Sequence, residues 1–147
     1  MLSGRFMVSK PSIHKVVVPG LPSRLEQVCD TILSQARANK YTEDEVFAMH
    51  LAIEEAFANA LRHGNRNDMK KTITVEYSVS PKRIDIFVTD QGSGFMPDDV
   101  PDPRCDENIY KTFGRGVLLM RSYMDKVEYN NPGNSVHMVK FKEKNNR

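Results

Sequence analysis

One helix, expected from Thr42 to His63, constrains the fold of this chain more than any other segment. Its start carries a capping box, in which Thr42 and Glu45 each accept a hydrogen bond from the backbone N–H of the other. Gly64 is a natural stop for the helix. Between these signals, apolar residues recur at helical spacing, namely Met49, Ile53, Ala56 and Ala60. This stripe predicts that one face of the helix lies against a core.

The remaining segments carry strand and helix signals. A second capping-box pattern, from Ser23 to Glu26, predicts another helix that runs to about Asn39. Alternating or β-branched runs predict five strands, and a glycine pair predicts the start of a third helix. The strands are expected over residues 13–18, 72–79, 84–90, 126–129 and 136–141, and the third helix over residues 116–123. This order predicts an α+β fold: a two-layer sandwich with helices on one face of a mostly antiparallel sheet.

Length and composition indicate an ordinary globular protein. The 147 residues suit one domain with a full-sized core, and a net charge of +2 gives no argument for nucleic acid as a partner. The cysteines, Cys29 and Cys105, lack metal-ligand spacing. The start of the chain is too short and mixed for a signal peptide, and no apolar run approaches the roughly 18 residues of a membrane span. We therefore expect a single-domain cytoplasmic protein with no membrane contact.

Two polar residues of the long helix could take part in chemistry. Glu55 and Asn59 lie one turn apart on one flank of the apolar stripe, whereas Glu54 points toward the opposite flank. Magnesium prefers oxygen ligands, so the amide oxygen of Asn59 could bind the ion together with phosphates and water. Glu55 could orient a water molecule or accept a proton from an attacking hydroxyl group. Taken alone, the pair is more typical of an incidental polar flank.

A turn that follows the expected strand at residues 84–90 is rich in glycine. Asp90 ends that strand and precedes Gly92 and Gly94. A carboxylate there can accept a hydrogen bond from an exocyclic amine such as that of adenine. Glycine also lets the backbone approach a flat ring closely. An ordinary strand-ending turn has the same composition, so this signal alone leaves both interpretations open.

A second glycine pair, Gly114 and Gly116, opens the third expected helix. Free backbone N–H groups at a helix start bind phosphate, and Arg115 could add positive charge. The preceding stretch, at about residues 96–113, is rich in proline and acidic residues and lacks periodicity. A stretch of this kind inside a domain is typical of a functional lid or of disorder. The chain has no P-loop motif.

The order and spacing of these motifs resemble those of the GHKL ATPase superfamily, which has the Bergerat ATP-binding fold. The motifs are Glu-x-x-x-Asn-Ala-x-x-His-Gly at residues 55–64, Asp-x-Gly-x-Gly at 90–94, and Gly-x-Gly at 114–116 with Met-Asp at 124–125. The resemblance covers about residues 12–142. Within the superfamily, the small single domain is similar to anti-sigma factor serine kinases of the RsbW and SpoIIAB type.

This resemblance implies roles for the residues that match its motifs. Asn59 would coordinate magnesium, and Glu55 would be the general base. Asp90 would bind the adenine amine of ATP, in a pocket shaped by Gly92 and Gly94.

The resemblance also concerns the lid and the last turn of the sheet. Gly114 and Gly116 would hold phosphates at the hinge of the lid. Many relatives carry threonine after the position of Gly133, where this chain has Asn134 and Ser135. An adenine-side hydroxyl group could come from Ser135 instead, or be missing.

In function, the resemblance implies a kinase that uses ATP and Mg²⁺. Such proteins phosphorylate a serine or threonine of an anti-anti-sigma partner with the STAS fold, sequester a sigma factor, and are often dimers. Three alternatives stay open at this point. They are a nucleotide-dependent binding module without phosphoryl transfer, a histidine-kinase catalytic domain, and an α+β domain that binds no nucleotide. The histidine-kinase alternative needs a preceding helical dimerisation segment, and the residues before the long helix predict only one strand and one helix.

Overall fold

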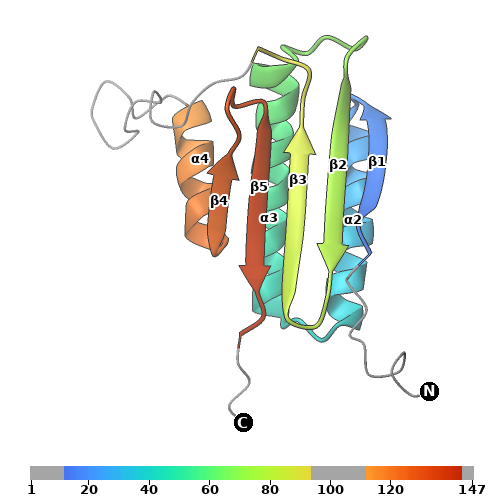
Figure 1. Ribbon diagram of the computed structural model, residues 1–147, viewed down its shortest axis with the longest axis vertical. Coiled ribbons are helices and arrows are strands. Elements are labelled where there is room, and N and C mark those ends of the chain that lie inside the picture. Colours follow the sequence, from blue (N-terminus) through green and yellow to red (C-terminus); the bar gives the residue numbers. More distant parts are fainter. Residues whose placement is uncertain (1–11, 94–111, 144–147) are drawn as a thin grey trace, which may run out of the picture.

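A five-stranded sheet and three long helices form two layers in the computed structural model, which describes residues 12–93 and 112–143 (Figure 1). In chain order, the elements are β1 (His14–Pro19), α2 (Pro22–Ala38), α3 (Glu43–Asn59), the π-helical turn η1 (Ala60–Gly64), β2 (Thr72–Val79), β3 (Arg83–Thr89), α4 (Thr112–Tyr123), β4 (Lys126–Tyr129) and β5 (Ser135–Phe141). The predicted α+β fold is confirmed. None of the helices in these two stretches combines the length and apolar character needed to cross a bilayer.

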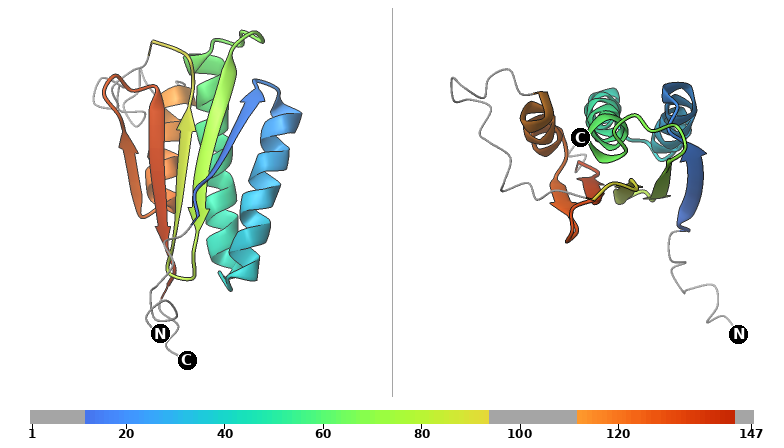
Figure 2. Two further views of the ribbon diagram at one scale, coloured as in Figure 1. Left: turned by 45° about the vertical axis from the view of Figure 1, so that its right-hand side comes forward. Right: turned by 90° about the horizontal axis from the view of Figure 1, so that it is seen from above.

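The sheet runs in the order β1-β2-β3-β5-β4, and every neighbouring pair is antiparallel. Side chains alternate along each strand, so one face of the sheet is apolar and the other mixed. The apolar face is covered by α2, α3 and α4, which lie side by side with α3 in the middle (Figure 2). The core between the layers includes Ile53 of α3, Ile73 of β2, Ile86 of β3 and Met138 of β5, all fully buried.

The predicted capping box at the start of α3 is confirmed. The Thr42 backbone N–H donates to Oε1 of Glu45 at 2.7 Å, and the Glu45 N–H donates to Oγ1 of Thr42 at 3.1 Å. Glu45 is only 2% exposed, and its second oxygen accepts a hydrogen bond from the Glu143 backbone N–H at 2.7 Å. A buried carboxylate is tolerated because both of its oxygens are paired. Glu45 therefore also ties the start of α3 to the chain beyond β5.

The predicted capping box at Ser23 and Glu26 is wrong. Helix α2 begins at Pro22, and its N-cap residue Leu21 makes no side-chain capping bond. Proline suits the first helical position because its φ angle is already helical and it has no N–H to satisfy. The start is instead held by the Leu21 backbone, which donates to the Pro19 carbonyl at 2.7 Å and accepts from later N–H groups.

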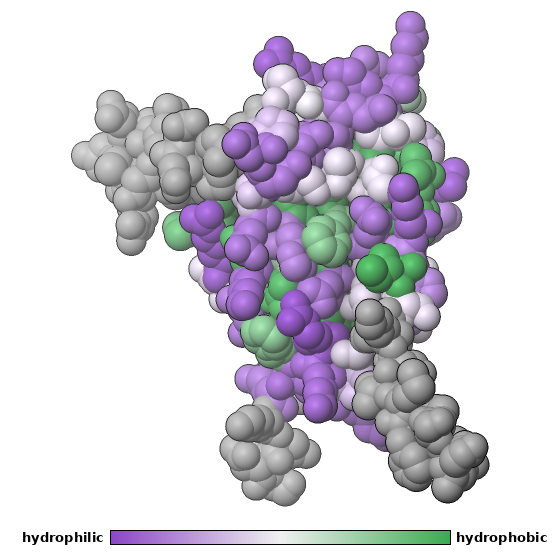
Figure 3. Space-filling view, viewed as in Figure 1, coloured by the Kyte–Doolittle hydropathy of each residue, from purple (hydrophilic) through white to green (hydrophobic). Residues whose placement is uncertain are grey.

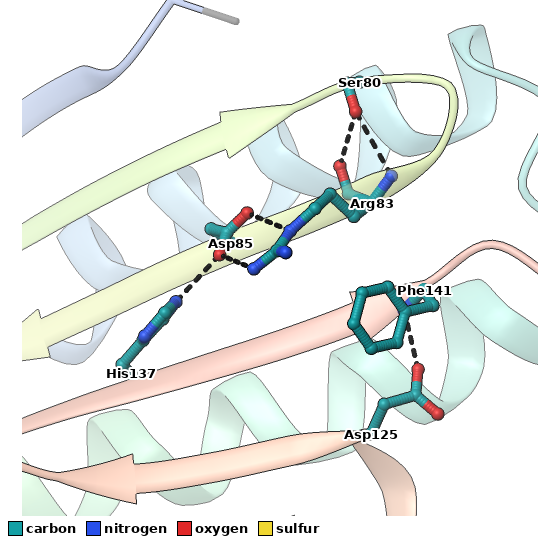
Figure 4. Close-up of polar contacts among 6 residues, drawn as sticks. All are labelled: Ser80, Arg83, Asp85, Asp125, His137 and Phe141. Atoms are coloured by element: carbon teal, nitrogen blue, oxygen red, sulfur yellow. Dashed lines mark hydrogen bonds and ion pairs between the residues drawn. The ribbon is translucent and has the colours of Figure 1, made fainter.

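The outer face of the sheet carries a charged cluster among scattered apolar side chains (Figures 3 and 4). Arg83 donates two hydrogen bonds to the Asp85 carboxylate, at 2.9 and 2.6 Å. From the neighbouring strand, Nε2 of His137 lies 2.8 Å from Oδ1 of Asp85. The His137 ring also stacks on Phe87, with centroids 4.0 Å apart. Asp85 is thus the centre of a cross-strand network that joins β3 to β5.

This network should make stability depend on acid pH through Asp85. Burial would raise the pKa of Asp85, but hydrogen bonds and charge from Arg83 and His137 hold it below its ordinary 3.8. A carboxyl group with a lowered pKa stabilises the fold above the pKa of the unfolded state, and that contribution is lost as pH falls through the folded pKa. We expect Asp85→Asn to cost about 1 kcal/mol of unfolding free energy at pH 7.

Urea unfolding at pH 7 and pH 3 checks this expectation. The difference between wild type and Asp85→Asn should shrink at the lower pH, because the wild-type carboxyl group then begins to protonate. Glu128→Gln, at an exposed carboxylate on the same sheet face, is the matched control and should have little effect at either pH. A difference for Asp85→Asn that stays constant or grows at pH 3 would contradict the assignment.

Candidate functional site

A cavity of about 230 Å³ lies between the end of α3 and the ends of β3, β4 and β5. Its lining combines small and apolar side chains with a few polar ones. The polar residues are Asn59, His63, Arg66, Asp90, Tyr129 and Asn134, and the others are Ala56, Ala60, Gly64, Val88, Gly133 and Val136. A hollow in which apolar walls are combined with converging polar groups is typical of a small-molecule site.

Asn59 contributes a buried amide to this cavity from the last residue of α3. The residue is 9% exposed, and its Nδ2 atom makes no hydrogen bond of normal geometry with any described residue. The side chain lies close enough to the Tyr129 hydroxyl group to favour phenol ionisation. Burial of the Tyr129 hydroxyl group opposes this effect and is the stronger of the two, so the pKa of Tyr129 is raised above its usual range. A buried polar atom without a good partner is uncommon in native proteins and indicates a group kept available for a ligand.

The helix changes its winding directly after Asn59. Residues Ala60–Gly64 form a π-helical turn, which the Asn65 backbone N–H closes by donating to the Ala60 carbonyl at 2.8 Å. Such turns insert an extra residue per turn and are frequent at functional sites. The turn carries His63 and Gly64 along the cavity wall. Burial, and to a lesser extent the charge of Arg62, lowers the pKa of His63 below its ordinary value.

Asp90 is packed against two glycines. Its half-buried carboxylate accepts a hydrogen bond from the Gly92 backbone N–H at 2.7 Å. Burial raises the pKa of Asp90, opposed by that hydrogen bond and by the charge of Lys71. A Cβ atom on Gly64 would overlap the Asp90 carboxylate, and one on Gly92 would overlap the Gly64 carbonyl. Close packing requires glycine at both positions, whereas the backbone conformation does not, since neither glycine has a positive φ.

Asn65, which sequence reasoning missed, connects the two turns beside the cavity. The residue is 1% exposed. Its Nδ2 donates to the Thr72 carbonyl at 3.0 Å, and its Oδ1 accepts from the Gln91 N–H at 2.7 Å. The Gln91 side chain in turn accepts from the Thr72 N–H at 2.7 Å. Asparagine after a glycine is common in any turn, so the sequence held no signal for this role.

The structure places Asn134, and not Ser135, at the cavity. The Asn134 side chain donates to the Asp90 carbonyl at 3.2 Å, and its backbone carbonyl accepts from the Asp90 N–H at 2.9 Å. The Ser135 hydroxyl group is hydrogen-bonded to the Thr89 hydroxyl at 2.6 Å and does not line the cavity. Ser135 is the first residue of β5 and the next residue, Val136, lines the cavity, so alternation along the strand turns the Ser135 side chain to the opposite face.

The two adjacent glutamates of α3 lie on different sides of the helix. Glu55 is half-buried, one turn before Asn59, and is not among the residues that line the cavity. Glu54 is exposed and forms an ion pair with His50, with Nε2 and Oε2 3.3 Å apart. Arg66 lines the cavity from the turn after α3, in a left-handed conformation with φ of 53°. It is a cavity cation that sequence reasoning did not single out.

The glycine pair lies inside α4 and does not open it. The helix begins at Thr112, so the expected start at Gly116 is wrong. Gly114 is the third helical residue, and its N–H belongs to the first turn, where N–H groups have no acceptor within the helix. The Arg115 side chain, Gly94 and the predicted lid up to residue 111 lie outside the described part of the structure. Cys105 does as well, whereas Cys29 is buried in α2 as expected.

Comparisons with known proteins agree with this geometry. A family model described as "Histidine kinase-like ATPase domain" matches residues 18–140. The chain is 29% identical over 133 residues to the serine-protein kinase RsbW of Bacillus velezensis, covering 84% of this chain and 82% of the relative. It is 28% identical over 133 residues to RsbW of Bacillus subtilis, with the same two coverages. It is 27% identical over 144 residues to RsbW of Listeria monocytogenes, covering 88% of this chain and 89% of the relative.

The packing of Gly64 against Asp90 leads to a test by substitution. Gly64→Ala should lower the free energy of unfolding by about 1–3 kcal/mol, because the new methyl group must displace the Asp90 carboxylate. Gly20→Ala is the matched control, since its added Cβ would meet only the end of the Leu61 side chain, at 3.0 Å. Thermal or urea unfolding of both variants measures the difference. An equal loss of unfolding free energy in Gly64→Ala and Gly20→Ala would contradict the close packing of Gly64 against Asp90.

Proposed function

Because the chain belongs to the histidine kinase-like ATPase family, we propose that it is a protein kinase that binds ATP and transfers the γ-phosphoryl group to a serine or threonine of a partner protein. The observation that carries this proposal is the buried Asn59 side chain, whose Nδ2 makes no hydrogen bond of normal geometry with a described residue, at a cavity that also holds Asp90.

The cavity chemistry suits the adenine end of ATP. The Asp90 carboxylate would accept a hydrogen bond from the exocyclic amine, and such a charged acceptor is strong when half-buried. Val88, Val136 and Ala56 provide apolar walls for a flat ring. Gly92 keeps the backbone near Asp90 free of a side chain, as close packing against a ring requires.

The phosphate end would be held by the end of α3 and the start of α4. The Asn59 amide oxygen would coordinate Mg²⁺, with the remaining ligands from phosphates and water. When bound, the ion would neutralise charge on the phosphates. Backbone N–H groups near Gly114 would bind phosphate oxygens, Gly116 would let them approach, and Arg115 and Arg66 would add positive charge.

For the transfer itself, we assign Glu55 the role of general base. The hydroxyl oxygen of the substrate would bond to the γ-phosphorus as the bond to the ADP oxygen breaks, and the hydroxyl proton would pass to the Glu55 carboxylate. Positioning of the reacting groups and compensation of charge supply most of the rate enhancement in such reactions. The position of Glu55 one helical turn before the proposed metal ligand supports this assignment.

The regulatory setting rests on the resemblance to anti-sigma factor kinases and on similarity along most of the chain to proteins named RsbW. We propose that the phosphorylated partner is an anti-anti-sigma protein with the STAS fold. The chain would also bind a sigma factor, so that phosphorylation decides which partner it holds. We also propose that the chain forms a homodimer.

A second candidate is a nucleotide-dependent binding module that transfers no phosphate. One observation favours it: Glu55 does not line the cavity. In that function, nucleotide would set partner affinity, and Glu55 would only be a polar residue of the helix flank.

Substituting the proposed base separates the two candidates. Glu55→Gln should reduce phosphoryl transfer by at least about 100-fold, because the amide cannot accept the proton, while ATP affinity stays nearly unchanged. The measurement is transfer of labelled γ-phosphate to a purified STAS-domain protein, with ATP binding followed by calorimetry. Asp44→Asn, at an exposed carboxylate in the first turn of the same helix, is the control and should retain full transfer.

Two outcomes would overturn the kinase proposal. A Glu55→Gln variant with wild-type transfer would remove Glu55 from the chemistry. Wild-type protein that binds ATP but never labels the STAS-domain protein would favour the binding module.

A further inference from the structure

The outer surface of α3, on the far side from the sheet, carries a regular stripe of side chains. Phe47, Leu51, Glu54 and Ala58 of α3, and Leu61 of the π-helical turn that follows it, are spaced at intervals of four, three, four and three residues. This heptad spacing is typical of a helix that packs against another helix. Phe47 is 62% exposed, and Leu51, Ala58 and Leu61 are half-buried. We call these five residues the outer stripe.

No helix or strand of the described part of the chain lies over this surface (Figure 2), and among the five side chains only Leu61, at its end, packs partly against the core. Helices α2, α3 and α4 form a single layer with α3 in the middle, and the sheet lies on one side of that layer only (Figure 2). The outer stripe thus combines the spacing of a helix–helix contact with the absence, among residues 12–93 and 112–143, of a helix that makes it. An exposed phenylalanine at one end adds to the unpartnered apolar area.

A groove of about 420 Å³ runs beside the outer stripe, between α2 and α3. It is larger than the 230 Å³ cavity at the other side of α3. Its floor is apolar and includes Leu25 and Cys29 of α2 with Phe57 of α3. An apolar groove between two helices, next to a heptad stripe, fits the apolar face of an amphipathic helix.

The rim of this groove is acidic. Glu26 of α2 and Glu54 of α3 line it, and Oε2 of Glu54 lies 3.3 Å from Nε2 of the half-exposed His50. Asp30 adds a third carboxylate nearby. The pKa of the Cys29 thiol is raised to about 12, mainly by burial and then by the negative charges of Glu54, Asp30 and Glu26. Arg62 lies at one end of the groove. The middle of the surface therefore complements a positive charge.

The position of Glu54 argues against a second copy of this chain as the occupant. Glu54 is the midpoint of the outer stripe, seven residues from Phe47 and seven from Leu61. Two copies of α3 that packed on this stripe about a two-fold axis would bring the Glu54 residues opposite each other. This holds for parallel helices and for antiparallel helices that overlap along the whole stripe, and like charges in contact are unfavourable.

We propose that the outer stripe and the adjacent groove dock an amphipathic helix of a partner protein, with apolar residues in the groove and a central arginine or lysine against Glu54. The interaction goes beyond the proposed kinase function, because it needs neither nucleotide nor phosphoryl transfer. Its specificity comes from the charge at the midpoint, and its affinity from the apolar residues on either side.

Two helical peptides test this assignment on the full chain. Both have about three heptads with leucine at the contact positions, and they differ only in a central arginine or glutamate. Fluorescence anisotropy, at concentrations where the peptides are monomeric, should show binding of the arginine peptide and binding of the glutamate peptide at least about tenfold weaker. Glu54→Lys should reverse this preference. Glu128→Lys, at an exposed carboxylate on the outer sheet face, should leave both affinities unchanged.

Several results would overturn the proposal. They are no binding of either peptide, equal binding of both, or an unchanged preference in Glu54→Lys that has the wild-type circular dichroism spectrum. Sedimentation equilibrium provides a further check: a dimer that Leu61→Glu dissociates would assign the surface to a second copy. ATP binding by the wild-type chain is measured without peptide, so failure here and failure of the kinase proposal are distinguishable.

Discussion

The end of helix α3 and the end of strand β3 meet at backbone contact distance, and the rest of the site depends on this contact. It exists only because Gly64 and Gly92 lack a Cβ atom. The Asp90 carboxylate occupies the space that a side chain on Gly64 would need, and Asn65 holds the two turns together through hydrogen bonds to Thr72 and Gln91. Helix and sheet are thereby joined at the point where the cavity opens.

This junction explains why α3 can carry two different surfaces. Its inner flank ends in Asn59 and the π-helical turn, which belong to the cavity. Its outer side carries the stripe centred on Glu54, for which we propose a helical partner. Anchored at Glu45 by the capping box and at Asn65 by the turn, the helix is held at both ends. A nucleotide and a partner would therefore contact opposite sides of one rigid element.

Much of the fold could be predicted because the deciding signals are local. The alternation of apolar and polar residues along short segments predicted the strands. The Thr42 capping box depends only on two residues that are three apart in the sequence. The Ser23 capping box failed because a neighbouring residue, Pro22, offered the backbone a competing helix start that needs no side-chain cap. Local patterns cannot rank two adjacent signals of this kind.

The site was less predictable because its geometry is tertiary. Asn65 and Arg66 follow a helix stop and resemble ordinary turn residues, and only the fold brings them to β3 and the cavity. Whether Ser135 faces the cavity depends on which face of β5 points toward α3, so it changes with a shift of one residue in register, whereas Asn134 precedes the strand and is held by the Asp90 backbone. For Glu55, the sequence predicts the flank of the helix but not its distance from a bound ligand.

The most direct test of the nucleotide site is thermal unfolding with ATP, with and without Mg²⁺, of wild type, Asn59→Ala and Lys126→Ala. ATP at about 100 times its dissociation constant should add roughly 2.7 kcal/mol of stability, a readily measured rise in melting temperature. We predict a magnesium-dependent rise that is lost in Asn59→Ala and retained in Lys126→Ala, whose side chain is exposed on β4. No rise in wild type, or an equal rise in Asn59→Ala, would contradict the assignment of this cavity to ATP and magnesium.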